Sequence, residues 1–154
     1  MMHKIKKAKD QHIEKITQLA HLLWPEENIN TLKKEMNHFH RDSTSELFIC
    51  EETKEIIGFA HVQLRYDYVE GTVSTPVGYL EGIYVREAYR KQGIGKQLVE
   101  VCEDWSRFMD ATEFASDVEL VNQKSADFHD SIGFKEVNRI ICYTKQLKKN
   151  KPKS

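Results

Sequence analysis

Hydrophobic residues recur at helical spacing near the start of the chain, which predicts an amphipathic helix there. Asp10 stands before this pattern as its N-cap, and Trp24-Pro25 ends it because the residue before a proline is pushed out of the helical region. Pro25 then fits the first turn of a second helix, which continues to about Phe39. A short strand over residues 2–8 precedes both helices. The apolar positions of the first helix are Ile13, Ile16, Leu19, Ala20 and Leu23.

Shorter apolar runs follow, and their β-branched and aromatic residues predict strands. Residues 46–68 form two strands that are joined by a tight polar turn at Thr53-Lys54. Residues 68–76 form a loop, and residues 77–85 form the next strand.

The second half of the chain predicts two more helices. The first covers residues 93–110, a strand follows over residues 112–117, and the second helix covers residues 122–132 with Gly133 as its C-cap. Residues 134–147 supply one or two final strands. This order of strands and helices predicts a mixed α/β (α+β) domain with a central, partly antiparallel sheet.

The length, charge and hydropathy of the chain argue against several classes of function. The chain has 154 residues, which suits one domain over residues 1–147 and a Lys-rich tail over residues 148–154. Its formal net charge is −1, so no global positive field argues for a nucleic-acid partner. The start of the chain has no apolar signal region, and no run approaches the length of a membrane span. We therefore expect a cytoplasmic protein without a nucleic-acid or membrane partner.

The cysteines, Cys50, Cys102 and Cys142, lie far apart and outside any C-x-x-C spacing. This pattern predicts buried free thiols in a reducing compartment, not a disulfide framework or a zinc site. His38 and His40 form the nearest pair of histidines, and no further ligands stand at metal spacing from them. We expect no metal ion.

The stretch "YVREAYRKQGIGKQL" carries the strongest chemical signal. Gly93 and Gly95 stand where a strand has ended and a helix begins, so unpaired backbone N–H groups converge with the positive end of the helix dipole. Arg90, Lys91 and Lys96 add positive charge, which completes the features of a phosphate cradle. The spacing is neither that of a P-loop nor that of a dinucleotide-binding fingerprint. Taken alone, the motif is equally consistent with a tight turn that holds no ligand.

In its wider context this stretch resembles the acetyl-CoA signature of the GNAT N-acetyltransferases, an Arg/Gln-x-x-Gly-x-Gly/Ala turn between a strand and a long helix. The resemblance implies the GNAT fold over almost the whole chain, with a central mixed, mostly antiparallel sheet flanked by helices. It also implies that acetyl-CoA is the co-substrate, that the turn holds its pyrophosphate and that the preceding strand pairs with its pantetheine arm. The residues implied in coenzyme binding are Ile83, Tyr84, Val85, Arg90, Gln92, Gly93, Ile94, Gly95, Lys96 and Asn122.

A second feature of the GNAT family is a later helix that ends in Gly-Phe, here "SADFHDSIGF". Many members carry in it a tyrosine that protonates the departing thiolate, whereas this chain has His129 at that place. A histidine can donate the proton or hydrogen-bond near the sulfur, so His129 is a candidate catalytic residue. The alternative is a histidine on the surface of the helix.

Two acidic residues stand at strand positions where a substrate amine can bind. Strand alternation places Glu81 on one face with Tyr79, Ile83 and Val85, and a carboxylate rarely occupies such a row unless it is paired or used. Asp117 ends the next strand. Either carboxylate can accept the proton of a bound ammonium, so both are candidate catalytic residues. The alternative for each is a structural salt bridge or a helix cap.

Several segments resemble the aminoglycoside 6'-N-acetyltransferases more closely than the GNAT family at large: "LLWP", "RYDYVEGT", "YLEGIYV", "EFASDVELVN" and "FHDSIGFKE". This resemblance implies that a homodimer transfers acetyl from acetyl-CoA to the 6'-amino group of aminoglycoside antibiotics, as a resistance enzyme. It places Trp24, Tyr68, Glu81 and Asp117 in the acceptor site.

Two positions depart from the pattern of these aminoglycoside enzymes. Glu27 stands where some relatives have a histidine, and Asn138 stands where some have a glutamate. Both positions contact the sugar in that family, often from the partner subunit, so the range of drugs stays open.

Two other functions compete with this reading. A GNAT acetyltransferase of another small polyamine would use the same carboxylates, whereas a peptide acceptor would need an extended groove with strand-edge pairing. A non-catalytic acyl-CoA-binding module would keep the glycine turn, but it would not need Glu81 or Asp117.

Overall fold

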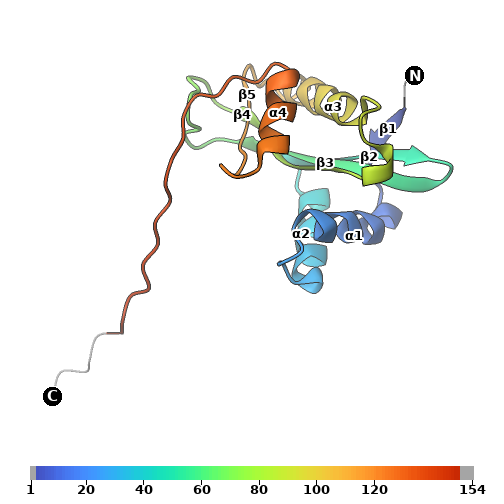
Figure 1. Ribbon diagram of the computed structural model, residues 1–154, viewed down its shortest axis with the longest axis horizontal. Helices are drawn as coiled ribbons and strands as arrows, with labels where there is room; N and C mark the ends of the chain where they lie inside the picture. Colours follow the sequence, from blue (N-terminus) through green and yellow to red (C-terminus); the bar gives the residue numbers. More distant parts are fainter. Residues whose placement is uncertain (1–2, 150–154) are drawn as a thin grey trace.

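The chain folds into one five-stranded sheet with helices on both faces (Figure 1). The computed structural model describes residues 3–149. The strand order is β1-β2-β3-β4-β5, and neighbouring strands are antiparallel except β4 and β5, which are parallel. The elements are β1 (Lys4–Lys7), the 3₁₀ turn η1 (Asp10–His12), α1 (Ile13–Leu23), α2 (Ile29–Arg41), β2 (Ser45–Glu52), β3 (Glu55–Arg65), β4 (Val77–Val85), the 3₁₀ turn η2 (Glu87–Tyr89), α3 (Ile94–Phe108), β5 (Phe114–Ser116) and α4 (Gln123–Ser131).

Two hydrophobic cores hold the helices to the sheet. Helices α1 and α2 cover one face, where Ile16, Leu32 and Phe59 are almost completely buried. Helix α3 covers the other face, where Leu98 and Cys102 are buried against the central strands, and α4 lies beside α3 (Figure 1). Burying one large apolar side chain contributes about 1.5–3 kcal/mol. Packing on both faces therefore makes the sheet a rigid frame for the site.

Most predicted elements are confirmed, including the mixed, mostly antiparallel sheet. The hairpin between β2 and β3 turns at Thr53-Lys54, where both residues adopt positive φ, 49° and 63°. Gly133 follows the end of α4 with φ of +95°. None of the helices in residues 3–149 is long and apolar enough to cross a membrane.

The two N-terminal helices begin at residues that differ from the predicted ones. Asp10 does not cap α1: it opens the turn η1, and its carboxylate lies 2.9 Å from Nε2 of His40. Pro25 precedes α2, because Asn28 is the N-cap and its Oδ1 accepts hydrogen bonds of 2.9 and 3.2 Å from two N–H groups of the first turn. A side chain that satisfies two of these N–H groups outweighs the preference of proline for the first turn. The end of α1 before Trp24 is as predicted.

A bulge in the pairing of β3 with β4 determines which way Glu81 points. The register shifts between His61 and Val62, so Glu81 has no residue of its own opposite it. Leu80 and Ile83 consequently both pack against the α3 core, although they are three residues apart. Glu81 faces α1 and α2 instead. The prediction that Glu81 shares a face with Ile83 is therefore wrong, because simple alternation fails at a bulge.

Strands β4 and β5 separate after a short paired stretch. Only Gly78, Tyr79 and Leu80 of β4 pair with β5, although β4 continues to Val85. The edge of β4 that faces β5 therefore has no strand partner over residues 81–85, within the part of the chain that the structure describes, although the Val85 carbonyl accepts from Arg90. A strand edge with free N–H and C=O groups can pair with an extended ligand.

The C-terminal segment forms neither of the strands predicted over residues 134–147. This segment has no regular secondary structure, and it runs away from the body of the protein as an extended, exposed chain (Figure 1). Cys142 is exposed as well, so the prediction of a buried thiol is confirmed for Cys50 and Cys102 but wrong for Cys142. An apolar run alone cannot tell whether its partner strand belongs to the same chain. The exposed apolar residues of the segment include Val137, Ile140, Ile141, Tyr143 and Leu147.

Candidate active site

A cavity of about 280 Å³ opens between helices α1 and α2 and the strands β3 and β4. It brings together Trp24, Glu27 and Glu81, three of the residues predicted for the acceptor site. Glu35 of α2 adds another carboxylate, which the sequence analysis missed. An acidic cavity with an aromatic wall suits a small polycation. The lining residues are Trp24, Glu27, Leu32, Glu35, Met36, Phe39, His61, Gln63 and Glu81.

The indole of Trp24 lies directly against β4. A Cβ atom at Gly82 would be 2.6 Å from Cη2 of Trp24, which is closer than real contacts allow. Gly82 therefore has no side chain because the tryptophan ring occupies that space. This contact fixes the ring beside Glu81, the next residue of β4.

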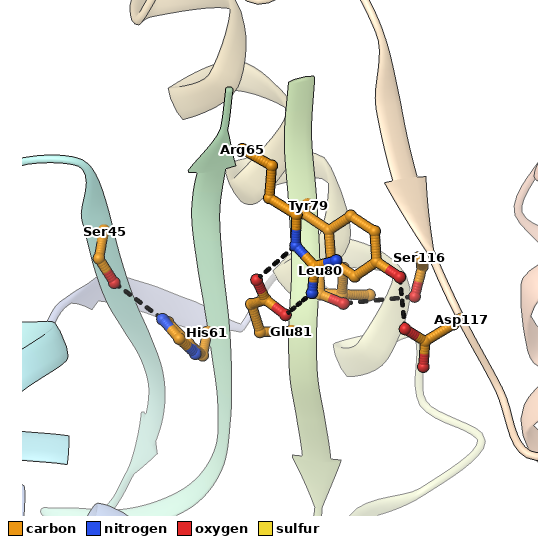
Figure 2. Close-up of polar contacts among 8 residues, drawn as sticks. All are labelled: Ser45, His61, Arg65, Tyr79, Leu80, Glu81, Ser116 and Asp117. Carbon is orange, nitrogen blue, oxygen red and sulfur yellow. Dashed lines mark hydrogen bonds and ion pairs between the residues drawn. The ribbon is translucent and has the colours of Figure 1, made fainter. Parts of the chain in front are cut away.

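Glu81 is held by an arginine that the sequence analysis did not consider (Figure 2). Arg65, the last residue of β3, donates from Nε to Oε2 of Glu81 at 3.0 Å and from Nη2 to Oε1 at 2.6 Å. The hydrogen bonds to Glu81 raise the pKa of Arg65, so the guanidinium stays charged. The salt bridge that we considered as an alternative for Glu81 is present, and both carboxylate oxygens of Glu81 accept hydrogen bonds from Arg65.

Tyr79 links this ion pair to the second predicted carboxylate (Figure 2). The guanidinium of Arg65 lies over the Tyr79 ring at 3.4 Å from its centroid. The hydroxyl of Tyr79 donates a short hydrogen bond to Oδ2 of Asp117. Burial raises the pKa of Tyr79, and the adjacent Asp117 raises it further, so the hydroxyl stays protonated and donates. The structure thus joins Glu81 and Asp117 through Arg65 and Tyr79.

The two carboxylates differ in the charge that balances them. Glu81 pairs with the Arg65 cation, whereas the hydrogen-bond partner of Asp117 is the neutral Tyr79. Within residues 3–149, no lysine or arginine forms an ion pair with Asp117, which is exposed just after β5. Asp117 is therefore the carboxylate whose negative charge is available to a bound ammonium.

A buried histidine forms part of the cavity wall. The Nε2 atom of His61 is 2.8 Å from Oγ of Ser45 (Figure 2), and the ring stacks on Phe39 with centroids 4.0 Å apart. Burial lowers the pKa of His61 to about 4. The ring is consequently neutral at pH 7 and cannot repel a cationic ligand.

The burial of His61 predicts a loss of stability in mild acid. The unfolded chain binds a proton on this residue near its ordinary pKa of 6.5, whereas the folded protein binds it only near pH 4. Between pH 7 and pH 4, His61 should therefore remove about 3 kcal/mol from the free energy of unfolding. Urea titrations of the wild type and of His61→Gln should show that the variant lacks this part of the pH dependence. Identical pH slopes for the two proteins would contradict the burial argument.

The glycine turn has the geometry of an anion site. Gly93 is the N-cap of α3 with φ of +83°, and a Cβ atom there would meet nothing within 4 Å. The N–H groups of residues 93–96 have no partner within the helix, because the first i→i−4 bond runs from Gln97 N–H to Gly93 C=O at 3.1 Å. Gly95 faces α4, where its Cβ would lie 3.0 Å from the Phe128 ring. The open space at Gly93 fits a pyrophosphate on these amides.

Three other predicted coenzyme residues also have structural roles. Nε of Arg90 donates to the carbonyl of Val85 at 2.7 Å, so this side chain also braces the end of β4. Ile94 is buried in the α3 core, which leaves its backbone N–H as the group for a ligand. Asn122 accepts a hydrogen bond from the N–H of Ser125 at 3.2 Å, so it acts as the N-cap of α4.

Three predicted acceptor residues, Tyr68, Asp117 and Asn138, do not line the cavity. Tyr68 is 76% exposed on the loop before β4. The Nδ2 atom of Asn138 donates to Oε1 of Glu70 at 3.0 Å, on the exposed C-terminal segment. Within residues 3–149, no group of three or more His, Cys, Asp and Glu side chains is placed to hold a metal ion.

The sequence contains a signal for the residues that the analysis missed. In β3, His61, Gln63 and Arg65 alternate with the apolar residues of the α3 core, so all three point towards α1 and α2. A polar row on a central strand indicates a site, just as the isolated Glu81 does. Glu35 had no such signal, because an exposed face of a helix is normally charged.

Comparison with known proteins agrees with this arrangement. The profile of the Acetyltransferase (GNAT) family matches residues 13–134. An "Aminoglycoside N(6')-acetyltransferase type 1" of Acinetobacter genomosp. 13 is 35% identical over 129 residues, which are 84% of this chain and 88% of the relative.

Solved structures give the same family. The structure of AAC(6')-Iy in complex with the bisubstrate analogue CoA-S-monomethyl-acetylneamine superimposes with a TM-score of 0.90, at 31% identity, over 96% of this chain and 100% of that one. The aminoglycoside antibiotic 6'-N-acetyltransferase AAC(6')-Ih from Acinetobacter baumannii gives a TM-score of 0.87 at 33% identity, over 95% of this chain and 99% of that one. With its sheet, its glycine turn and these relatives, the chain belongs to the GNAT acetyltransferase family.

Proposed function

We propose that this protein transfers the acetyl group of acetyl-CoA to the 6'-amino group of aminoglycoside antibiotics. One observation carries the proposal: Asp117, which forms no ion pair with a lysine or arginine of residues 3–149, stands just after β5, where β4 and β5 separate. The names of the relatives support the same reaction, since they are aminoglycoside 6'-N-acetyltransferases, one of them bound to a CoA–neamine analogue.

The residues around the glycine turn fit coenzyme A. The N–H groups of residues 93–96 and the nearby Lys96 can hold the pyrophosphate, and the free edge of β4 over Ile83–Val85 can pair with the pantetheine arm. Acetyl-CoA supplies the activated acetyl group, and no metal is needed for this chemistry. The paired part of β5 ends at Ser116, so the thioester end of the arm would lie beside Ser116 and Asp117.

The carboxylates have two different roles towards the acceptor, binding and proton transfer. Glu27, Glu35 and Glu81 make the cavity acidic, which attracts the several ammonium groups of an aminoglycoside. Asp117 can hydrogen-bond the reacting ammonium and accept its proton, which gives the free amine that attacks the thioester. Arg65 reduces the charge on Glu81, so Glu81 orients the acceptor and does not act as the base.

The test uses acceptors that differ at one atom. Kanamycin A and tobramycin carry a 6'-amine, and we expect acetylation there, whereas paromomycin carries a 6'-hydroxyl and should not turn over at that position. A hydroxyl offers neither a positive charge nor enough nucleophilicity for a carboxylate base. Thiol release and NMR of the product report both outcomes. Acetylation of another amine, or equal turnover of the hydroxyl compound, would contradict the proposed regiochemistry.

The same assay separates the competing functions. Turnover of spermidine that exceeds that of kanamycin would favour the polyamine reading. Absence of coenzyme A release with every amine would favour a binding module. We also propose that the reaction takes place in the cytoplasm, where Cys50 and Cys102 remain free thiols.

We further propose that two copies of the chain form a homodimer through the C-terminal segment, residues 134–149. This segment is apolar but exposed, with Ile141 78% and Tyr143 85% accessible, and such a surface is unfavourable in water. Strand β5 is an edge strand, so it offers free backbone groups to a segment from a second copy. Pairing there would bring Asn138 of one subunit near the acceptor site of the other.

Light scattering at micromolar concentration tests the dimer. We expect a mass twice the 18.1 kDa of one chain for the wild type, and a single-chain mass for Ile141→Lys, which places a charge in the apolar segment. Val73→Lys is the matched control, because Val73 is 98% exposed on the loop before β4 and should leave the dimer intact. A wild-type mass of one chain would overturn the proposal.

A further inference from the structure

A serine and a histidine meet where β4 and β5 separate. The Oγ atom of Ser116 is 2.9 Å from Nε2 of His129 and 3.4 Å from the carbonyl oxygen of Leu80 (Figure 2 shows Ser116 and Leu80). The Nδ1 atom of His129 is 2.7 Å from the carbonyl oxygen of Ser125, one turn earlier in α4. His129 is therefore not a free surface histidine.

These partners determine which nitrogen of the ring carries the proton. A carbonyl oxygen only accepts, so Nδ1 of His129 must donate to Ser125. In the neutral ring Nε2 then has a free lone pair, which accepts from the hydroxyl of Ser116. In the protonated ring Nε2 donates to Ser116, and the hydroxyl turns to donate to the carbonyl of Leu80. The geometry satisfies both charge states, and they differ only in the rotation of one hydroxyl.

The position of this pair matches the reacting end of the cleft. Ser116 pairs with Leu80, the last register position before the free edge of β4 begins. Asp117, the proposed base, is the next residue along the chain. The ring of His129 is half-buried and lies against two aromatic rings, with centroids 5.8 Å from that of Phe128 and 5.0 Å from that of Phe134. These contacts hold the ring beside Ser116.

We propose that the hydroxyl of Ser116 is the proton donor to the departing coenzyme A sulfur, and that His129 is the positioning residue that resupplies it. The inference rests on the proposed acetyl transfer. As the C–S bond breaks, its electron pair goes to sulfur, and Ser116 gives its proton to that thiolate. Ser116 takes the Nε2 proton of protonated His129 in the same step, which leaves the neutral ring with its proton on Nδ1. Asp117, which is exposed, first passes the ammonium proton to solvent and then takes the proton that the nitrogen loses as the amide forms. His129 takes up a proton from solvent before the next turnover, so each cycle releases one net proton and the charges balance.

A purely structural role predicts the same hydrogen bonds, but Nε2 of His129 would not change from acceptor to donor during the reaction. In that case Ser116 and His129 only tie α4 to β5, and the loss of either should lower the melting temperature without a selective loss of turnover. The two readings therefore differ in the response of the His129 ring to coenzyme A and in the split between kcat and affinity.

NMR of nitrogen-15 histidine tests the pair without turnover, and the His129→Gln variant assigns the signals of the His129 ring. We expect the free protein to show the proton on Nδ1. Ser116→Ala should shift the Nε2 resonance and leave that of Nδ1 in place, and coenzyme A should move Nε2 in the wild type only. A ring protonated on Nε2 alone, or an Nε2 resonance that ignores both changes, would overturn the inference.

Kinetics then measure the contribution of the pair. Ser116→Ala and His129→Gln should each lower kcat by roughly 10²-fold, the usual contribution of a positioned acid, while calorimetry shows unchanged affinity for coenzyme A. Ser116→Thr keeps a hydroxyl and should restore most of kcat. Ser131→Ala is the control, because it removes from α4 a hydroxyl that donates to Phe128 C=O at 2.7 Å, away from the cleft.

The outcomes distinguish the two proposals. Acetylated product at the 6'-amine with full kcat in Ser116→Ala would overturn the proton relay and leave the acetyltransferase standing. If Ser116→Thr loses as much kcat as Ser116→Ala, and both variants also have a lowered melting temperature, the pair has a structural role. The absence of product from the wild type with every 6'-amine would refute the proposed function itself.

Discussion

Asp117→Asn should lower kcat/KM for a 6'-amino aminoglycoside by roughly 10²–10⁴-fold, the range expected when a positioned general base is removed. The asparagine keeps the shape of the side chain and can still accept from the Tyr79 hydroxyl, so the fold should not change. It cannot take a proton from the ammonium. Steady-state kinetics with kanamycin A measure the loss, and calorimetry should show unchanged acetyl-CoA affinity.

Two neighbouring variants serve as controls for Asp117. Tyr79→Phe removes the hydrogen bond to Asp117 but keeps its charge and the ring under Arg65, so the expected loss is smaller. Glu81→Gln removes a carboxylate that Arg65 already balances, and its effect should fall mainly on KM for the aminoglycoside. If Asp117→Asn retains kcat/KM within threefold of the wild type, Asp117 is not the base.

Gly93→Glu should largely abolish acetyl-CoA binding. The side chain would project into the open space at the N-terminus of α3, where the amides of residues 93–96 otherwise hold the pyrophosphate. Its negative charge would also repel the phosphates. Calorimetry with acetyl-CoA measures the affinity, and urea titration measures the cost to the fold.

Gly133→Glu is a matched control for the strain at Gly93. Gly133 has φ of +95° and, like Gly93, nothing within 4 Å of an added Cβ, but its N–H donates to the Asp130 carbonyl and is not part of the proposed phosphate cradle. Both variants should lose a similar amount of stability, about 1–2 kcal/mol, since a side chain disfavours positive φ. Unchanged coenzyme affinity in a folded Gly93→Glu variant would reject the phosphate cradle, whereas Gly133→Glu should bind normally.

Much of the site can be derived from sequence because local chemistry determines it. Gly93 and Gly95 at the start of a helix create free N–H groups wherever the chain goes next, so the cradle needs no tertiary information. Asp117 follows the end of a strand directly, so it lies at the end of the sheet, where a cleft can open. Arg65 and Tyr79 were missed as a connected pair, because β3 and β4 must pair before their side chains can meet.

The sequence alone determined the order of strands and helices up to α4, the glycine turn and the residue types of an acidic acceptor site, because periodicity and turn chemistry act over a few neighbouring residues. Tertiary structure alone decided where those residues point. The bulge opposite Glu81 turned it away from Ile83 and towards Trp24, and that bulge arises from the pairing of β3 with β4. The C-terminal segment is the complementary case. Its apolar run predicts a strand, but a strand forms only when a partner supplies the other half of each hydrogen bond, and among residues 3–149 of one chain the segment 134–149 has no such partner.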